Sequence, residues 1–297
     1  MRHSMGIFWA LAALLLLSCE SADSASGDDD GASDSDGDTD TDADSDVDTD
    51  TDSDSDSDTG TDDECYEMVD IVFALDVSTS MTYILQTLHD EIGLVWSAAE
   101  EISASESPHF GLAVFVDDFT VVNLGQPYDS VEAIQDDFQF WCDHCSSNNQ
   151  TQGGLPNGDW PENTLDALYA AADEFEWRDE EHALRVIIHC TDDTFLEHPE
   201  AFWPSGIPVL RTYAETVTRL QDQTVRVASF ASHIGGQFGQ YSADPGFFTP
   251  WYDQTAIPQA TSGAVYDIDQ VYADELSLTE AINGFVIDEL CDPYVPE

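Results

Sequence analysis

The chain contains no lysine, and its six basic residues are all arginine, against 62 Asp plus Glu. The formal net charge of the 297 residues is therefore −56. A surface this acidic repels nucleic acid and anionic lipid headgroups, so electrostatic binding to either is excluded. Divalent cations are the partners that such a charge favours.

The chain also lacks an apolar run long enough to cross a membrane, which needs about 20 residues. Its N-terminal run, 7–17, has 11 residues. Flanked by Arg2 and by Ser18-Cys19, this run is typical of a secretory signal over residues 1–19. The ending Leu-Leu-Ser-Cys resembles a bacterial lipobox, in which Cys19 becomes the lipidated first residue. The alternative is an ordinary cleaved signal. We expect an exported protein, lipid-anchored to a bacterial membrane, at the outer membrane or cell surface, with no other membrane contact.

Residues 20–63 have no aromatic residue and consist almost wholly of Asp, Ser, Thr, Gly and Ala. Such a segment buries too little apolar surface to offset its ordering entropy. We therefore predict a disordered acidic linker, whose 44 residues would span at most roughly 145 Å. A calcium-binding repeat is the alternative, but Gly is missing from the fixed turn positions of a calcium loop.

Residues 64–297 form the predicted domain, with 42 acidic residues and five arginines, a net charge of −37. A chain of this length has room for one substantial core. Short apolar runs at 71–75, 110–116, 119–124, 184–190, 225–230 and 264–268 predict strands. Amphipathic patterns at 82–103, 131–140, from Thr164, at 209–220 and at 276–290 predict helices. The alternation favours a Rossmann-like three-layer α/β/α sandwich with a mostly parallel sheet and one antiparallel edge strand.

Cysteines are few: five remain in the chain beyond Cys19. Cys65 precedes the first predicted strand and Cys291 ends the last helical pattern, so we expect a disulfide that joins the ends of the domain. Cys142 and Cys145 lie in CDHC, which reads as a polar loop, and in an exported protein this pattern favours a small disulfide loop over a redox or zinc pair. Cys190, inside an apolar run, is expected to be a free buried thiol.

The stretch DIVFALDVSTSM, residues 70–81, ends an apolar strand in a carboxylate followed by hydroxyls. Asp76, Ser78 and Ser80 are spaced at i, i+2 and i+4, which puts them on one side of an extended loop. Hard oxygen ligands of this kind suit Mg²⁺ or Ca²⁺. The alternative is a strand that ends in an Asx or Ser turn.

Two further predicted strands end in carboxylates, at Asp117 and at Asp192 in TDD. In an open parallel sheet, ligands bind beyond the carboxyl ends of the strands. We therefore expect Asp76, Asp117 and Asp192 to lie at one edge.

With these motifs in this order, the domain resembles the von Willebrand factor type A (VWA) domain with its metal-ion-dependent adhesion site (MIDAS). The resemblance implies that Asp76, Ser78 and Ser80 hold the metal, with Asp192 acting through a water. It also implies one more ligand before the helix that starts at Thr164, and counting back from Ala167-Leu168 gives Glu162. The cap of this helix is Thr164 or Asn163, and for Thr164 itself a helix cap is favoured over a metal ligand.

The stretch 157–162, NGDWPE, is similar to the corresponding loop of the integrin β-subunit I-like domain. That likeness implies a second, adjacent Ca²⁺ whose ligands are Asp117, Asn157, Asp159, the Pro161 carbonyl and Glu162. A third integrin-type site is not expected, because Tyr83 and Ile84 stand where it needs acids. Asp193 replaces the Gly that commonly follows the final Asp.

The charges suggest a reason for two ions. Asp76, Glu162 and Asp192 place three negative charges around one divalent cation, so a single ion would attract an acidic ligand poorly. We hypothesise that binding of an acidic ligand depends on two ions that share Glu162.

The expected function is binding of an extracellular or periplasmic protein or glycan partner, through a carboxylate on the metal, without catalysis. The first alternative is a metal-dependent hydrolase, although no His lies close to the three motifs to act as its base. The second is a structural or calcium-buffering envelope protein. Two aromatic-rich loops either contain specificity determinants for a partner or only cover the domain's own core. Their aromatic residues are Phe195, Phe202, Trp203, Phe238, Tyr241, Phe247, Phe248, Trp251 and Tyr252.

Overall fold

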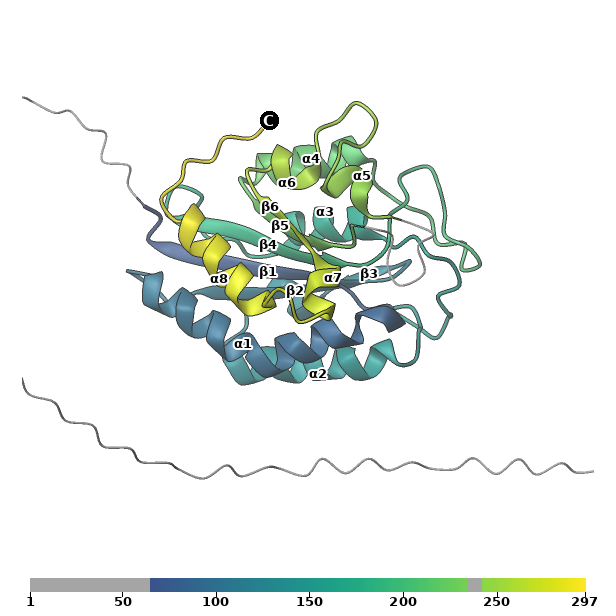
Figure 1. The fold of residues 1–297 in the computed structure, drawn as a ribbon, viewed down its shortest axis with the longest axis horizontal. Coiled ribbons are helices and arrows are strands. Elements are labelled where there is room, and N and C mark those ends of the chain that lie inside the picture. Colours follow the sequence, from purple (N-terminus) through teal and green to yellow (C-terminus); the bar gives the residue numbers. More distant parts are fainter. Residues whose placement is uncertain (1–64, 234–241) are drawn as a thin grey trace, which may run out of the picture. The chain divides into compact units, whose positions relative to one another are not determined.

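The computed structural model describes residues 65–233 and 242–297. Its centre is a six-stranded sheet in the order β3-β2-β1-β4-β5-β6 (Figure 1). The strands are β1 (Met68–Asp76), β2 (His109–Phe115), β3 (Phe119–Val121), β4 (Ala183–Thr191), β5 (Arg226–Ala231) and β6 (Ala264–Asp267). All neighbouring pairs are parallel except β2 and β3, which are antiparallel at one edge. The predicted fold class is confirmed.

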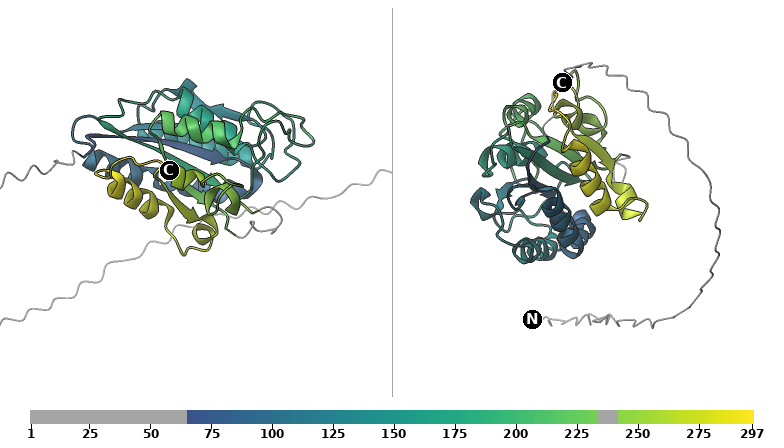
Figure 2. Two further views of the ribbon diagram at one scale, coloured as in Figure 1. Left: turned by 90° about the horizontal axis from the view of Figure 1, so that it is seen from above. Right: turned by 90° about the vertical axis from the view of Figure 1, so that its left-hand side faces the viewer.

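Helices cover both faces of this sheet (Figures 1 and 2). On one face lie α1 (Thr82–Ile102), α2 (Val131–Cys145), α7 (Ile268–Tyr272) and α8 (Leu278–Glu289). On the other lie α3 (Thr164–Glu174), α4 (Tyr213–Asp222), α5 (Asp244–Phe247) and α6 (Ile257–Ala260). Two short 3₁₀ turns, η1 (Thr79–Met81) and η2 (Val122–Gly125), follow β1 and β3.

The side-chain pattern of β1 explains the three layers. Val69, Ile71, Phe73 and Leu75 pack against the α1 side, whereas Val72 and Ala74 pack against the α3 side. Successive side chains of a strand point to opposite faces, so a continuous apolar run is buried on both. The sheet is therefore sandwiched between helices.

The strand order positions the functional edge. From β1 the chain moves to β2 and β3 on one side, and then returns to β4 on the other side of β1. The order therefore reverses between β1 and β4, and at such a point the two following loops diverge and leave a crevice. The loops after β1 and β4 carry the two predicted metal motifs.

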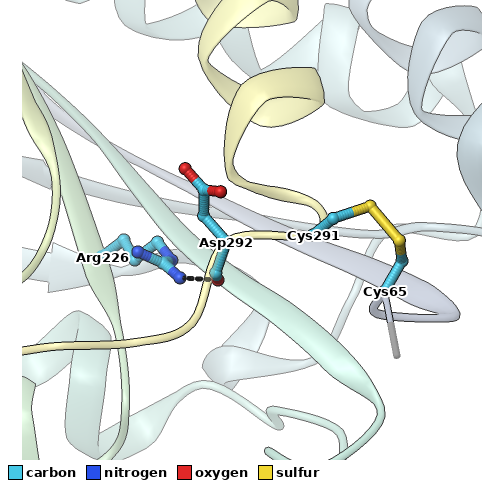
Figure 3. Close-up of a disulfide and its surroundings, with 4 residues drawn as sticks. All are labelled: Cys65, Arg226, Cys291 and Asp292. Carbon is cyan, nitrogen blue, oxygen red and sulfur yellow. Dashed lines mark hydrogen bonds between the residues drawn. A yellow bond between two sulfur atoms is a disulfide. The ribbon is translucent and has the colours of Figure 1, made fainter. Parts of the chain in front are cut away.

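The opposite end of the domain is closed covalently. Cys65 and Cys291 form a disulfide across 226 positions of sequence, as predicted (Figure 3). Beside it, the buried Arg226 donates a hydrogen bond of 2.5 Å to the backbone oxygen of Asp292. The chain after α8 is thus held against the sheet.

The expected disulfide between Cys142 and Cys145 is wrong, because both are free and buried. The segment CDHC is the last turn of α2 and not a loop. Trp141, Cys142 and Cys145 are buried along with Ile134 and Phe138, so burial of this apolar face extends the helix five residues past the predicted end. Cys190 is free and buried, as expected.

Two other boundaries differ from the sequence pattern. Strand β3 ends at Val121, and η2 replaces its predicted continuation to 124. Helix α4 begins at Tyr213 and not at 209, because Thr212 caps it in a reciprocal capping box with Glu215.

The signal segment 1–19, Cys19 and the linker 20–63 lie outside the described residues, as do Phe238 and Tyr241. In the described ranges, none of the helices is both long enough and apolar enough to cross a membrane.

Candidate metal centre

Asp76 is the last residue of β1 and is fully buried. Its Oδ1 accepts a hydrogen bond of 2.7 Å from the Ser78 amide. Its Oδ2 accepts one of 2.9 Å from the hydroxyl of Thr191, the last residue of β4. The carboxylate is thus held at the switch point by both central strands. Thr191 was not singled out in the sequence, although it directly precedes Asp192.

The hydroxyls of Ser78 and Ser80 connect the loop after β1 with the loop after β4. Ser78 Oγ and Ser80 Oγ lie 3.1 Å apart, and Ser80 Oγ donates to Asp192 Oδ1 at 2.9 Å. The predicted ligands Asp76, Ser78, Ser80 and Asp192 are therefore brought together by the loops after β1 and β4. A strand that merely ended in an Asx turn would not predict the Ser80–Asp192 contact.

Glu162 reaches the same edge from the loop before α3. Its amide donates to the Thr194 carbonyl at 2.8 Å, which places it beside the loop after β4. Its side chain is 1% exposed, and Oε1 accepts a hydrogen bond of 2.9 Å from Asn157 Nδ2. Glu162 is thus oriented by Asn157, a second residue of its own loop.

Asn163 ties this loop to the end of β2. Its amide donates to the Val116 carbonyl at 2.7 Å, and its Nδ2 donates to the Asp117 carbonyl at 3.0 Å. Asn163 occupies the cap position of α3 without a side-chain cap bond. The predicted capping role of Thr164 is not what the structure shows: Thr164 is the first residue of the helix, inside the cap position.

Buried oxygens without hydrogen-bond partners gather in this region. The described part of the chain has 13 buried side-chain polar atoms without a partner, and seven of them are oxygens of Asp117 and the segment 157–164. They are Asp117 Oδ1 and Oδ2, Asn157 Oδ1, Asp159 Oδ1, Glu162 Oε2, Asn163 Oδ1 and Thr164 Oγ1. Buried acceptors normally find donors, and leaving one unpaired costs about 1–3 kcal/mol. Six of the seven are carboxylate or amide oxygens, and the seventh is a hydroxyl that can also accept, so the cluster fits a bound cation.

The carboxyl groups here have raised pKa values. Burial, and then the charge of Asp192, raise the pKa of Asp76 from 3.8 to about 7. Burial, and then Asp192 and Asp76, raise the pKa of Asp193 to about 8. Burial, followed by Asp76, Asp193 and Asp117, holds the pKa of Glu162 well above its usual range. The fold thus holds these like charges close together, and no basic residue is among the described groups that act on them. A bound divalent cation would relieve the repulsion between them.

Asp117 is fully buried, and burial raises its pKa to about 6. The nearby Ser205 and Gln150 side chains offset part of this rise in pKa. Among the described residues, however, no donor lies within hydrogen-bond geometry of either Asp117 oxygen. Asp117 therefore lies at the edge of the sheet with two acceptor oxygens available for a ligand.

A cavity of about 340 Å³ opens on this edge. It is lined by Ser78, Thr79, Ser80, Asn148, Asn157, Asp159, Trp160, Glu162 and Asp193. Thr79, Asn148 and Trp160 had no role in the sequence prediction. Trp160 stands between two predicted second-site residues, Asp159 and Pro161, and that position alone could have drawn attention to it.

Asp159 links the cavity to the loop after β4. Its Oδ2 accepts a hydrogen bond of 2.7 Å from the Trp203 amide. The neighbouring Gly158 lies so close to Pro204 that an added Cβ would be 2.2 Å from the ring. The loop 157–162 is therefore packed directly against residues 203–204.

Three of the candidate aromatic determinants are core residues. Phe195, Phe202 and Phe247 are each at most 2% exposed, so for them the alternative, that they cover the domain's own core, is confirmed. Trp203 and Tyr252 are 71% and 82% exposed and remain available.

The donor set fits a divalent cation only as a mixed site. Within residues 65–233 and 242–297, no group of three or more His, Cys, Asp or Glu side chains is arranged to hold a metal ion. Ser78 and Ser80 hydroxyls and the Asn157 amide oxygen would have to complete the coordination, and all are hard oxygen donors of the kind Mg²⁺ and Ca²⁺ prefer.

No family model matches the chain, and no curated protein matches it. Among the solved structures that resemble this chain is an aerotolerance-related membrane protein from Bacteroides fragilis. The match has 14% identity, covers 74% of this chain and 99% of that chain, and has a TM-score of 0.45. Proximal thread matrix protein 1 from the mussel byssus has 14% identity, covers 78% of this chain and 48% of that chain, and has a TM-score of 0.44. The structure of that protein with a zinc-occupied MIDAS motif has 17% identity, covers 58% of this chain and 40% of that chain, and has a TM-score of 0.38. This chain thus spans about half of the mussel chain, or less.

Proposed function

We propose that residues 64–297 are a VWA-type domain that holds a divalent cation at the β1–β4 switch point and binds a partner there. Asp76, Ser78, Ser80, Asp192 and Glu162 would hold this ion, Mg²⁺ or Ca²⁺. Asp117, Asn157, Asp159, the Pro161 carbonyl and Glu162 would hold an adjacent Ca²⁺. The observation that carries the proposal is the cluster of seven buried, unpartnered oxygens in Asp117 and 157–164.

The chain's own residues hold the carboxylates of Asp76 and Glu162 in place before any ion binds. Thr191 and the Ser78 amide fix both oxygens of Asp76. Asn157 orients Glu162, whose second carboxylate oxygen is buried without a hydrogen-bond partner in the described residues. When bound, a divalent cation would supply an open coordination position for a carboxylate of the partner.

A binding role is favoured over a catalytic one by the composition of the cavity. Among the described residues, the cavity lining includes no Cys or Lys to act as a nucleophile and no His to act as a base. The partner we propose is an extracellular or periplasmic protein or glycan that presents a carboxylate.

The N-terminal sequence supports an exported location. We propose that Cys19 carries a lipid in a bacterial membrane and that residues 20–63 extend the domain away from it. Radiolabelled fatty acid should be incorporated into the full chain and not into Cys19→Ala. Equal labelling of both would contradict the anchor.

The binding role is tested with a panel of extracellular proteins and acidic glycans offered to the immobilised full chain. Binding should occur with Ca²⁺ and Mg²⁺, be lost with chelator, and be lost in Asp76→Ala. Asp288→Asn, which removes an exposed charge on α8, is the matched control and should bind normally. Binding that survives both chelation and Asp76→Ala would contradict the proposal.

A further inference from the structure

Asp193 is a fourth carboxylate at the metal centre that the proposed ligand set does not use. It follows Asp192 directly and lines the same cavity as Ser78, Ser80 and Glu162. Its backbone is held in place by Thr191, whose hydroxyl contacts both the amide and the carbonyl oxygen of Asp193 at 3.3 Å. Since Thr191 also holds Asp76, the positions of Asp193 and Asp76 are set by one hydroxyl.

In residues 65–233 and 242–297, the hydrogen bonds of Asp193 are those of its backbone with Thr191. Its charged neighbours are all acidic: the charges of Asp192 and Asp76 act on it, and its own charge acts on Glu162. This half-buried residue lines the cavity although three like charges are near it.

We propose that Asp193 is an internal carboxylate ligand of the metal centre, on the cavity side from which a partner's carboxylate would approach. The inference rests on the proposed function, because it concerns the same ion. It assigns to Asp193 a role in choosing the ion and in limiting access of acidic partners.

Ion choice follows from the number of carboxylates. Asp193 adds a carboxylate to a cavity that Glu162, a member of the proposed ligand set, also lines. Ca²⁺ accepts six to eight oxygens in flexible geometry, whereas Mg²⁺ requires octahedral coordination and keeps several waters. An added carboxylate therefore favours Ca²⁺ over Mg²⁺.

Access of a partner follows from charge and space. An external carboxylate would have to displace Asp193 from the ion and enter a cavity that already carries excess negative charge. Replacing Asp193 by the Gly common in VWA domains removes both obstacles.

Terbium luminescence tests the inference without a partner, using Tb³⁺ as a Ca²⁺ analogue on the full chain. Trp160 lines the cavity and can sensitise a bound Tb³⁺, whereas residues 20–63 contain no aromatic residue, so ions bound there stay dark. The lifetime in H₂O and D₂O gives the number of coordinated waters. Calorimetric titration with Ca²⁺ and Mg²⁺ is run beside it, on the full chain, Asp193→Asn, Asp193→Gly and the control Asp288→Asn.

We expect Asp193→Asn and Asp193→Gly to gain about one coordinated water and to lose about tenfold in Ca²⁺ affinity, with a smaller loss for Mg²⁺. Asp288→Asn should match the unmodified chain. An unchanged water count and an unchanged ratio of Ca²⁺ to Mg²⁺ affinity in both variants would overturn the inference and leave the metal centre standing. Failure of the unmodified chain to bind Tb³⁺ or Ca²⁺ near Trp160 would overturn the metal centre, and the inference with it.

Discussion

Replacing Asp117 by Asn should stabilise the metal-free domain and destabilise the metal-loaded one. Burial raises the pKa of Asp117 from 3.8 to about 6. Between these values the folded state keeps a proton that the unfolded state has lost, so stability falls as pH rises through this window. Above it, a rise of about two pH units at 1.36 kcal/mol each costs about 3 kcal/mol.

Asp117→Asn removes that cost. In chelator at pH 8, its free energy of unfolding should exceed that of the unmodified chain by up to about 3 kcal/mol, and at pH 5 by about half as much. With saturating Ca²⁺ the order should reverse, because the variant loses a metal ligand. Urea unfolding, followed by far-UV circular dichroism in the four combinations of pH and metal, measures the difference.

Asp118 provides the matched control, one residue away. Its carboxylate accepts hydrogen bonds of 2.7 and 2.8 Å from the Thr151 and Gln152 amides. Asp118→Asn should therefore lose about 1–3 kcal/mol in all four conditions. Destabilisation of Asp117→Asn in chelator at pH 8, with no reversal by Ca²⁺, would refute the assignment of Asp117 to a metal-binding edge.

Three further predictions concern the site and its frame. Ser80→Ala removes the hydroxyl between the loops after β1 and β4 and should lower Ca²⁺ affinity about tenfold by calorimetry; unchanged affinity would contradict its role. Gly158→Ala would place a Cβ 2.2 Å from a proline ring and should weaken Ca²⁺ binding, whereas Gly154→Ala, with nothing within 4 Å of the added Cβ, should not. Reducing Cys65–Cys291, which are separated by 226 positions, should lower the free energy of unfolding in urea by about 5 kcal/mol or less; no change would contradict the structural role of the bridge.

The sheet and the convergence of Asp76 with Asp192 were predictable because both depend on local patterns. A buried apolar run marks a strand, and the carboxyl ends of parallel strands share one edge. Asp76 and Asp192 each follow such a run directly. The contact between Ser80 and Asp192 then follows from topology.

Other features depend on contacts that no local pattern contains. The predicted helix start at 209 fails because the amides of Leu210 and Arg211 donate to Asp166, a residue of α3. Cys142 and Cys145 belong to α2 because α1 covers them, and Cys142 Sγ lies 3.9 Å from the Thr82 carbonyl.

Buried aromatics were equally hard to assign. Phe195 stacks with Tyr213 and meets Phe247 edge-on, so three segments far apart in sequence form one cluster. A loop aromatic that covers its own core cannot be told from one that contacts a partner until those neighbours are known.

Anomalous diffraction from crystals grown with Mn²⁺ tests the central claim most directly. Our account predicts one peak among Asp76, Ser78, Ser80 and Asp192, and a second among Asp117, Asn157 and Asp159, with Glu162 between them. Crystals of the folded domain with neither peak at saturating Mn²⁺ would contradict it.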